Sequence, residues 1–295
     1  MKNEDKKYWI WFSKLKSVNC IQKNLLLKLY CMPQEIWKLE EEELNKIKSL
    51  SKESINEILN NKNRENLEEY VNYINKENIK IITIYDEIYP ERLKNIYDKP
   101  VVLYAKGNLK LLNEEGVSIV GSRDCSSYGK QISELLAYNL AKKNKCIISG
   151  LAKGIDTCAH IGTLKAKGKT IAVIGNGIDN IYPFENKKLS ELILKNNGLI
   201  ITEYIIGARP DKLNFPQRNR IISGLSDGVV VVEAKRKSGA LITADFALEQ
   251  GKDVFAVPGN INNVNSEGTN ELIKQGAHIV TNYKDILDIC YGLTN

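Results

Sequence analysis

The sequence predicts an α/β protein with a parallel β-sheet covered by helices on both faces, preceded by a small all-helical domain. Two observations predict this fold. Over residues 8–78, apolar residues recur at spacings of three and four, which is typical of amphipathic helices. From Val117 onward, short runs rich in Val and Ile alternate with helical patterns, which indicates parallel strands buried on both faces. We therefore divide the chain into a helical domain, residues 1–78, and a sheet domain, residues 79–295.

The helical domain is predicted to contain four or five helices. Breaks between them are expected near Asn19, at Met32-Pro33 and within Ser49–Ser54. In the last of these, Ser51 resembles a helix start, because serine commonly caps helix N-termini. The acidic run Glu40–Glu43 is interpreted as the solvated face of a helix.

The sheet domain is predicted to contain nine strands separated by helices. The expected strands are Lys80–Tyr85, Val101–Ala105, Val117–Gly121, Cys146–Ser149, Thr170–Gly175, Leu199–Thr202, Val229–Glu233, Val254–Val257 and His278–Val280. One helical turn is expected at Arg92–Asn95, and longer helices at Tyr128–Lys143, Ile155–Lys167, Asn186–Asn196, Gln217–Leu225, Leu241–Gln250, Thr269–Gln275 and Tyr283–Ile289.

Composition narrows the class of protein. The longest apolar runs, Tyr8–Phe12 and Val101–Ala105, are five residues long, whereas a membrane span needs about 20. The first residues also lack the apolar stretch of a signal peptide, so we expect a cytoplasmic protein without a membrane segment. The six cysteines and two histidines have no metal-binding spacing, so we expect reduced thiols and no metal site. The formal net charge of +6 is modest, and a solvated lysine-rich surface explains it.

Five glycine-rich turns follow predicted strands. The first contains Gly121, Ser122 and Arg123, and the second carries Lys153 in the sequence Ser149–Gly154. The carboxyl ends of parallel strands meet at one sheet edge, and glycine lets a phosphate approach the N–H groups at a helix N-terminus. These turns therefore predict a phosphate-binding cleft that contains Arg123 and Lys153.

Several familiar nucleotide and hydrolase motifs are incomplete or absent. Gly175-Asn176-Gly177 lacks the third glycine of a dinucleotide fingerprint, and the chain contains neither a P-loop nor a G-x-S-x-G elbow. His160 follows Asp156 by one helical turn, which leaves two interpretations open. A structural hydrogen bond of His160 is favoured over a role as general base.

The segment Asp211–Arg220 places Phe215 among Lys212, Arg218 and Arg220. An aromatic ring beside cations is typical of single-stranded nucleic-acid sites, where a base stacks on the ring and the cations hold the backbone. The alternative is a core phenylalanine whose neighbouring arginines have structural partners. Both interpretations remain open at this point.

Together these motifs resemble the DprA/Smf family of bacterial DNA-processing proteins. The matching stretches are residues 119–129, 149–160, 170–186, 201–260 and 266–277, and the upstream stretch 89–112 also looks like the family. The resemblance implies an extended Rossmann-like domain that binds single-stranded DNA without catalysis or cofactor. It further implies a protein that protects incoming DNA during natural transformation, forms a homodimer and loads the RecA recombinase.

The resemblance also assigns site residues. It implies DNA contacts by Gly121, Ser122, Arg123, Lys153, Lys212 and Phe215, whereas Arg218 and Arg220 have either a structural role or a DNA contact. For the homodimer, the apolar segments Val254–Val257 and Ile279–Ile289 are the expected contact region.

The sequence departs from the family pattern in two places. The glycines of a helix-hairpin-helix are absent near Ser17–Ile21, and no C-terminal winged-helix domain is expected because the sequence ends at Asn295. Two other functions remain as alternatives, a small-nucleotide sensor and a phosphoribohydrolase of the same superfamily. The glycine loop of the latter is altered here, because eight residues separate Pro258-Gly259 from Gly268-Thr269 and Glu271 comes one position early.

Overall fold

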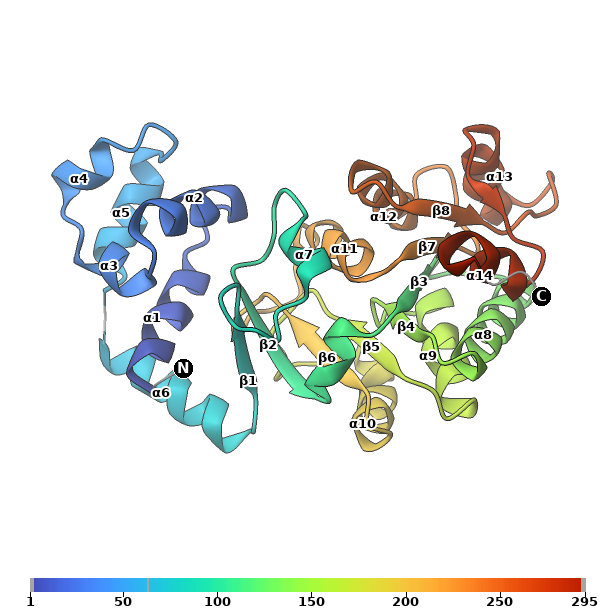
Figure 1. The fold of residues 1–295 in the computed structure, drawn as a ribbon, viewed down its shortest axis with the longest axis horizontal. Coiled ribbons are helices and arrows are strands. Elements are labelled where there is room, and N and C mark those ends of the chain that lie inside the picture. The colour runs from blue at the N-terminus through green and yellow to red at the C-terminus, as the bar shows by residue number, and fades with distance from the viewer. Residues whose placement is uncertain (1–2, 63, 293–295) are drawn as a thin grey trace.

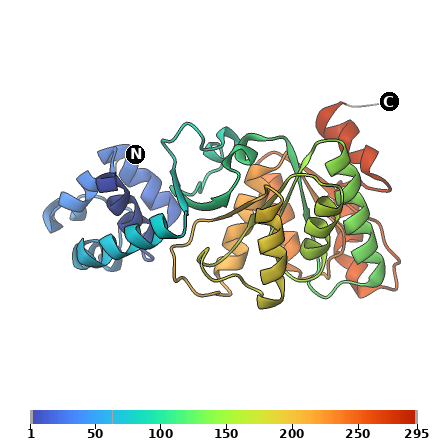
Figure 2. The ribbon, with the colours of Figure 1, turned by 90° about the horizontal axis from the view of Figure 1, so that it is seen from below.

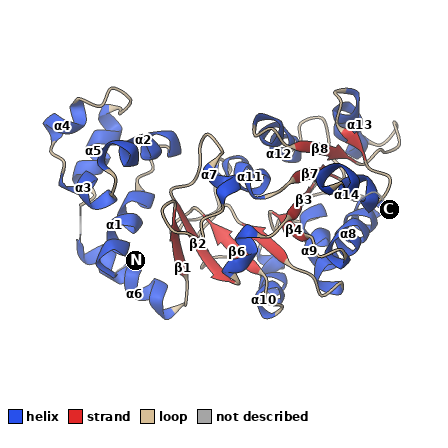
Figure 3. Ribbon diagram, viewed as in Figure 1, coloured by secondary structure: helices blue, strands red, loops and turns tan. Residues whose placement is uncertain are grey.

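The computed structural model describes residues 3–62 and 64–292. The helical domain lies at one end of an elongated molecule, and the sheet with its covering helices forms the rest (Figures 1 and 2). The strands are confined to the sheet domain (Figure 3). The predicted α/β fold with a preceding helical domain is therefore confirmed.

The described part of the helical domain contains six helices, more than the four or five expected. They are α1 (Asn3–Lys14), α2 (Cys20–Tyr30), α3 (Pro33–Lys38), α4 (Glu41–Asn45), α5 (Lys52–Asn60) and α6 (Arg64–Lys76). The predicted breaks are present: Asn19 caps α2, Pro33 begins α3 and Ser51 caps α5. The additional helix begins in the acidic run, because Glu40 and Glu43 cap the N-terminus of α4 reciprocally.

The sheet has nine strands in the order β1-β2-β6-β5-β4-β3-β7-β8-β9. They are β1 (Lys80–Thr83), β2 (Val102–Gly107), β3 (Gly116–Val120), β4 (Cys146–Ser149), β5 (Thr170–Val173), β6 (Leu199–Thr202), β7 (Gly228–Val231), β8 (Asp253–Ala256) and β9 (His278–Ile279). From β6 to β9 all neighbours are parallel, whereas β2 pairs antiparallel with both β1 and β6. The sheet is thus parallel with an antiparallel edge.

Helices cover both faces of the sheet (Figure 1). One face carries α7 (Glu91–Lys94), α11 (Asn214–Leu225), α12 (Gly239–Glu249) and α13 (Glu267–Lys274). The other carries α8 (Ser127–Lys142), α9 (Ile155–Lys165), α10 (Lys187–Lys195) and α14 (Tyr283–Tyr291). Helix α11 begins three residues before the predicted start, since Pro216 is tolerated in a first helical turn. This start places Phe215 in that turn.

The helical domain packs directly against the sheet domain. Trp9, Trp11 and Phe12 of α1 share one apolar core with Val102 and Tyr104 of β2. The Ser13 and Tyr104 hydroxyl groups also lie 2.6 Å apart. Burial of these large side chains against β2 removes apolar surface from water and so fixes the helical domain to the antiparallel edge.

Candidate nucleic-acid interface

The candidate interface lies at the carboxyl edge of the central strands. Strands β3, β4 and β5 are adjacent and parallel, so the turns that follow them meet at one edge of the sheet. These turns carry Arg123, Lys153 and Tyr182, and the segment after β6 carries Lys212 and Phe215. Four of these residues are predicted from the sequence, and Tyr182 is not.

The turn after β3 is held by internal hydrogen bonds. The Ser122 N–H donates to the Glu233 carbonyl at 2.7 Å, and the Ser122 carbonyl accepts from Ile155 N at 3.2 Å. A Cβ atom at Gly121 would lie 2.6 Å from Cγ1 of Ile155, so glycine is required by packing against α9. Ser122 is buried and Gly121 is half-buried, whereas Arg123 is exposed at the tip. The turn therefore presents Arg123 to solvent on a rigid base.

A buried carboxylate occupies the N-terminus of α8. Glu233 is 1 % exposed and accepts from the Ser126 N–H at 2.8 Å and from its hydroxyl at 2.5 Å. In many Rossmann folds this first helix N-terminus holds a phosphate. Here the protein's own carboxylate takes that place, and sequence reasoning missed it because Glu233 appeared only as the end of a strand.

Phe215 lies in an aromatic and cationic cluster. The guanidinium carbon of Arg123 lies over its ring, 5.2 Å from the centroid. The Tyr182 ring packs on it with centroids 5.6 Å apart and planes inclined by 34°. A Cβ atom at Gly175 would come within 2.9 Å of the Phe215 ring, so glycine permits this close approach. Phe215 is half-buried, so it is not a core side chain of the kind that the alternative interpretation requires.

Lys153 forms an exposed ion pair across two turns. Its Nζ lies 2.5 Å from Oε1 of Glu185, and the two side chains are 54 % and 62 % exposed. The hydrogen bond from Lys153 lowers the pKa of the Glu185 carboxyl, so Glu185 stays ionised near neutral pH. An anionic ligand that approaches Lys153 must compete with this carboxylate.

Of the helices that begin at this edge without a side-chain cap, two follow a candidate lysine. They are α9, whose preceding turn carries Lys153, and α11, whose preceding segment carries the exposed Lys212. By contrast, Ser126 caps α8 and Ser238 caps α12. The positive dipole ends of α9 and α11 therefore add to the lysine charges where phosphates would bind.

Arg218 is a buried structural residue. It is 4 % exposed, and its guanidinium donates to the carbonyls of Gly150, at 2.8 Å, and of Val173. Burial raises the pKa of the nearby Asp156 carboxyl, and the positive charge of Arg218 counteracts that rise. The Asp156 carboxylate also accepts a hydrogen bond from the Gly150 N–H at 3.0 Å. Arg218 thus ties α11 to the ends of β4 and β5.

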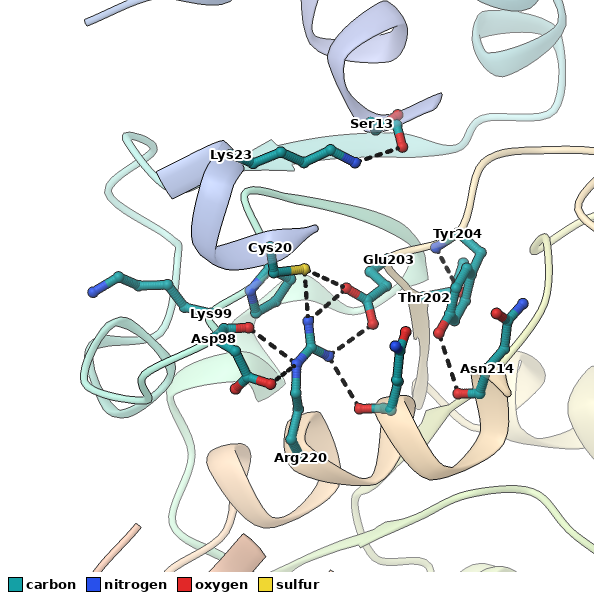
Figure 4. A network of polar contacts seen from close by, with 12 residues as sticks. Ser13, Cys20, Lys23, Asp98, Lys99, Thr202, Glu203, Tyr204, Asn214 and Arg220 are labelled. Atoms are coloured by element: carbon teal, nitrogen blue, oxygen red, sulfur yellow. Dashed lines mark hydrogen bonds and ion pairs between the residues drawn. The ribbon is translucent and has the colours of Figure 1, made fainter. Parts of the chain in front are cut away.

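Arg220 is likewise buried, at the contact between the two domains (Figure 4). It makes two 2.7 Å hydrogen bonds to the Glu203 carboxylate and a 2.9 Å ion pair with Asp98. The Cys20 sulfur, at the start of α2, lies 3.1 Å from Nη2 of Arg220. Burial raises the pKa of this thiol to about 11, so it remains protonated and donates to Glu203.

His160 has a structural environment. It is buried, and its Nδ1 lies 2.8 Å from the Thr170 hydroxyl, which itself donates to the Ile147 carbonyl. The Nδ1–H of His160 is therefore the donor to Thr170. Burial lowers the pKa of His160 to about 3, so the ring is neutral at physiological pH. The favoured structural interpretation agrees with this geometry.

Residues 3–62 and 64–292 contain neither a candidate metal site nor a candidate membrane helix. Within this part of the chain, no group of three or more His, Cys, Asp or Glu side chains could hold a metal ion. The same residues include no helix long and apolar enough to cross a membrane. All six cysteines are unpaired thiols.

The fold and the site define a Rossmann-like α/β protein with a cationic, aromatic carboxyl edge. Residues 80–290 match the family described as DNA recombination-mediator protein A, so the chain belongs to that family. The chain is 50 % identical over 205 residues to DNA processing protein DprA of Streptococcus pneumoniae, covering 70 % of this chain and 72 % of that protein. It is 36 % identical over 291 residues to protein Smf of Synechocystis, covering 97 % and 73 %. These relatives confirm the resemblance to the DprA/Smf family.

Solved structures give the same assignment. The crystal structure of DNA processing protein A from Streptococcus pneumoniae superposes with a TM-score of 0.83 at 39 % identity, covering 95 % of this chain and 96 % of that one. DNA processing protein A from Helicobacter pylori, described for its unique single-stranded DNA binding mode, matches with a TM-score of 0.65 at 34 % identity. That match covers 73 % of this chain and 98 % of the Helicobacter chain.

Proposed function

We propose that this protein binds single-stranded DNA at the carboxyl edge of β3, β4 and β5, with Phe215 stacking on a base. The observation that carries the proposal is the Arg123–Phe215 contact, because it joins a cation and an aromatic face at one point of the edge. Exposed Lys153 and Lys212 supply further charge for the phosphates. The Helicobacter pylori relative, described for its single-stranded DNA binding mode, supports the same ligand.

The proposed contact set differs from the one predicted from sequence. Arg123, Lys153, Lys212 and Phe215 remain in it as side-chain contacts. Gly121 and Ser122 contribute by shaping the turn that carries Arg123. Arg218 and Arg220 leave the set, because both are buried and their guanidinium groups already have internal partners.

For the biological role we propose protection of incoming single strands and loading of RecA onto them during natural transformation. Membership of the recombination-mediator family supports this role. We propose that the protein acts in this role by binding DNA rather than by catalysis. Strand exchange by RecA on DNA pre-bound by the single-strand-binding protein, with and without this chain, measures the loading activity.

We further propose a homodimer that forms through the β9–α14 end of the sheet. Ile279 and Ile289 are 52 % and 41 % exposed there, and Leu135 of α8 is 55 % exposed. The other predicted segment, Val254–Val257, is buried inside the sheet and cannot contribute contact surface. Light scattering at micromolar protein should give twice the chain mass, and a monomer mass would reject this proposal.

A phosphoribohydrolase remains the alternative enzyme. The α13 N-terminus, where its altered glycine loop ends, already donates the Gly268 N–H to the Ala234 carbonyl at 2.8 Å. The α8 N-terminus is taken by Glu233. Release of ribose 5-phosphate from AMP would support the enzyme, and calorimetry with mononucleotides would detect a sensor.

The proposed function is tested by comparing the affinities of single- and double-stranded DNA of equal length at one salt concentration. We expect tighter binding of the single strand, because only unpaired bases offer a free face to Phe215. Equal affinity for both forms, or no binding of either, would reject the proposal.

A further inference from the structure

The segment Tyr182–Glu185 connects the two parts of the proposed DNA interface. Its first residue, Tyr182, packs on the Phe215 ring with centroids 5.6 Å apart. Its last residue, Glu185, lies 2.5 Å from Nζ of Lys153. The segment therefore contacts Phe215 at its first residue and Lys153 at its last.

Phe184 lies within this segment and is 76 % exposed. The backbone around it is fixed: Pro183 is buried, and the Asn186 side chain donates to the Leu151 carbonyl at 2.8 Å. Tyr182, two residues earlier, is itself 44 % exposed. The fold thus holds an exposed apolar ring on the segment that joins the aromatic cluster to the Lys153 ion pair.

We propose that Phe184 is a second stacking surface, which takes a base next to the one that stacks on Phe215. This proposal rests on the proposed function, since it adds a nucleotide to the same single strand. A phosphate at Lys153 would place the following base near Phe184, because phosphates and bases alternate along the strand. Stacking tolerates any base, so the position would lengthen the site without selecting a sequence.

A tryptophan substitution provides a direct optical test. The native Trp9, Trp11 and Trp37 are at most 8 % exposed and lie in helices α1 and α3 of the helical domain. In Phe184→Trp, the introduced indole is therefore the one tryptophan at the interface. Titration with oligo-dT should quench its emission with the same midpoint as the binding curve. Saturating DNA that leaves the emission unchanged would overturn the proposal.

Affinity measurements separate stacking from simple apolar contact. Phe184→Ala should weaken binding of long oligo-dT by about fivefold or more, the effect of losing one base stack. Phe184→Tyr should retain affinity, whereas Phe184→Leu should behave like Phe184→Ala. The matched control is Leu248→Ala, which removes a 58 % exposed apolar side chain at the last turn of α12.

The two proposals fail in distinguishable ways. If the wild type binds single-stranded DNA and Phe184→Ala binds equally well, the second stacking surface is rejected and the proposed function stands. If the wild type does not bind single-stranded DNA, both are rejected. Reduced affinity of Phe184→Leu and Phe184→Ala, with Leu248→Ala unchanged, supports both.

Discussion

The guanidinium group of Arg123 lies over the ring of Phe215, 5.2 Å from its centroid. The two residues are 92 positions apart in sequence, and they come from the turn after β3 and from the first turn of α11. Their contact joins the cation of one turn to the aromatic surface of another. In the proposed interface, a base stacks on Phe215 while Arg123 holds the adjacent phosphate.

The first prediction separates stacking from packing at Phe215. Phe215→Ala should cost about 1–3 kcal/mol of single-strand affinity, the usual value of one base–aromatic stack. Its effect on the free energy of unfolding should stay well below the roughly 3–5 kcal/mol typical of a core phenylalanine, because the ring is half-buried. Titration calorimetry and denaturant unfolding measure the two quantities. Lys212→Ala is the control: it should weaken binding through charge and leave stability unchanged. Wild-type affinity in a folded Phe215→Ala protein would show that the ring does not contact DNA.

A second prediction concerns salt. If Arg123, Lys153 and Lys212 each neutralise one phosphate, replacing any one by Ala should flatten the slope of log K against log salt by about 0.7. The slope comes from anisotropy titrations at several salt concentrations. Lys165→Ala is the matched control, because Lys165 is exposed but lies in the last turn of α9, at the opposite end of that helix. Unchanged slopes for all three variants would remove these residues from the interface.

The third prediction follows from the ion pair between Lys153 and Glu185. Glu185→Gln removes a negative charge beside the proposed phosphate position and frees Lys153. Single-strand affinity should therefore rise, by roughly two- to fivefold at low salt, since exposed ion pairs are weak. The double variant Lys153→Ala with Glu185→Gln should show less of this gain. Weaker binding by Glu185→Gln alone would mean that the carboxylate takes part in DNA recognition.

A fourth prediction uses the buried His160. Burial lowers the pKa of His160 to about 3, below the ordinary value of 6.5 for the unfolded chain. Below about pH 6.5 the unfolded state therefore takes up a proton that the folded state does not. Stability falls with decreasing pH over this window, by up to about 1.4 kcal/mol per pH unit from this group. Denaturant unfolding between about pH 3 and pH 6.5 measures the free energy of unfolding as a function of pH. Its slope against pH should be shallower for His160→Gln than for the wild type. Identical slopes would contradict the assignment of a neutral, buried ring.

Much of this architecture follows from the sequence. Val- and Ile-rich runs such as Val117–Gly121 mark all nine strands to within two residues, because buried strands need continuous apolar character. The antiparallel pairing of β2 is not encoded in such runs, since strand direction depends on the connections between strands. The acidic run Glu40–Glu43 lies on the exposed face of a helix, as interpreted from the sequence, but the break between α3 and α4 was not predicted, because the capping pair Glu40 and Glu43 looks like any acidic surface.

The site was only partly predictable. Arg123, Lys153, Lys212 and Phe215 lie in recognisable turns and segments, so their position at the sheet edge follows from the fold. Like Lys212, Arg218 and Arg220 are cationic residues of the segment Asp211–Arg220, so the sequence does not separate buried from exposed positions. The folded chain shows that the guanidinium groups of both arginines are buried against carbonyls and Glu203. Tyr182 and Glu233 reach the site through three-dimensional contacts that no local pattern indicates.

Photocrosslinking tests most directly whether single-stranded DNA lies on Phe215. An oligo-dT that carries iododeoxyuridine is bound to the wild-type protein, irradiated and digested with trypsin, and the adducts are located by mass spectrometry. The tryptic peptide Leu213–Arg218 contains Phe215 as its single aromatic residue. We predict the principal adduct in this peptide and its loss in Phe215→Ala. Adducts confined to other peptides, with Leu213–Arg218 recovered unmodified at saturating DNA, would contradict the proposed interface.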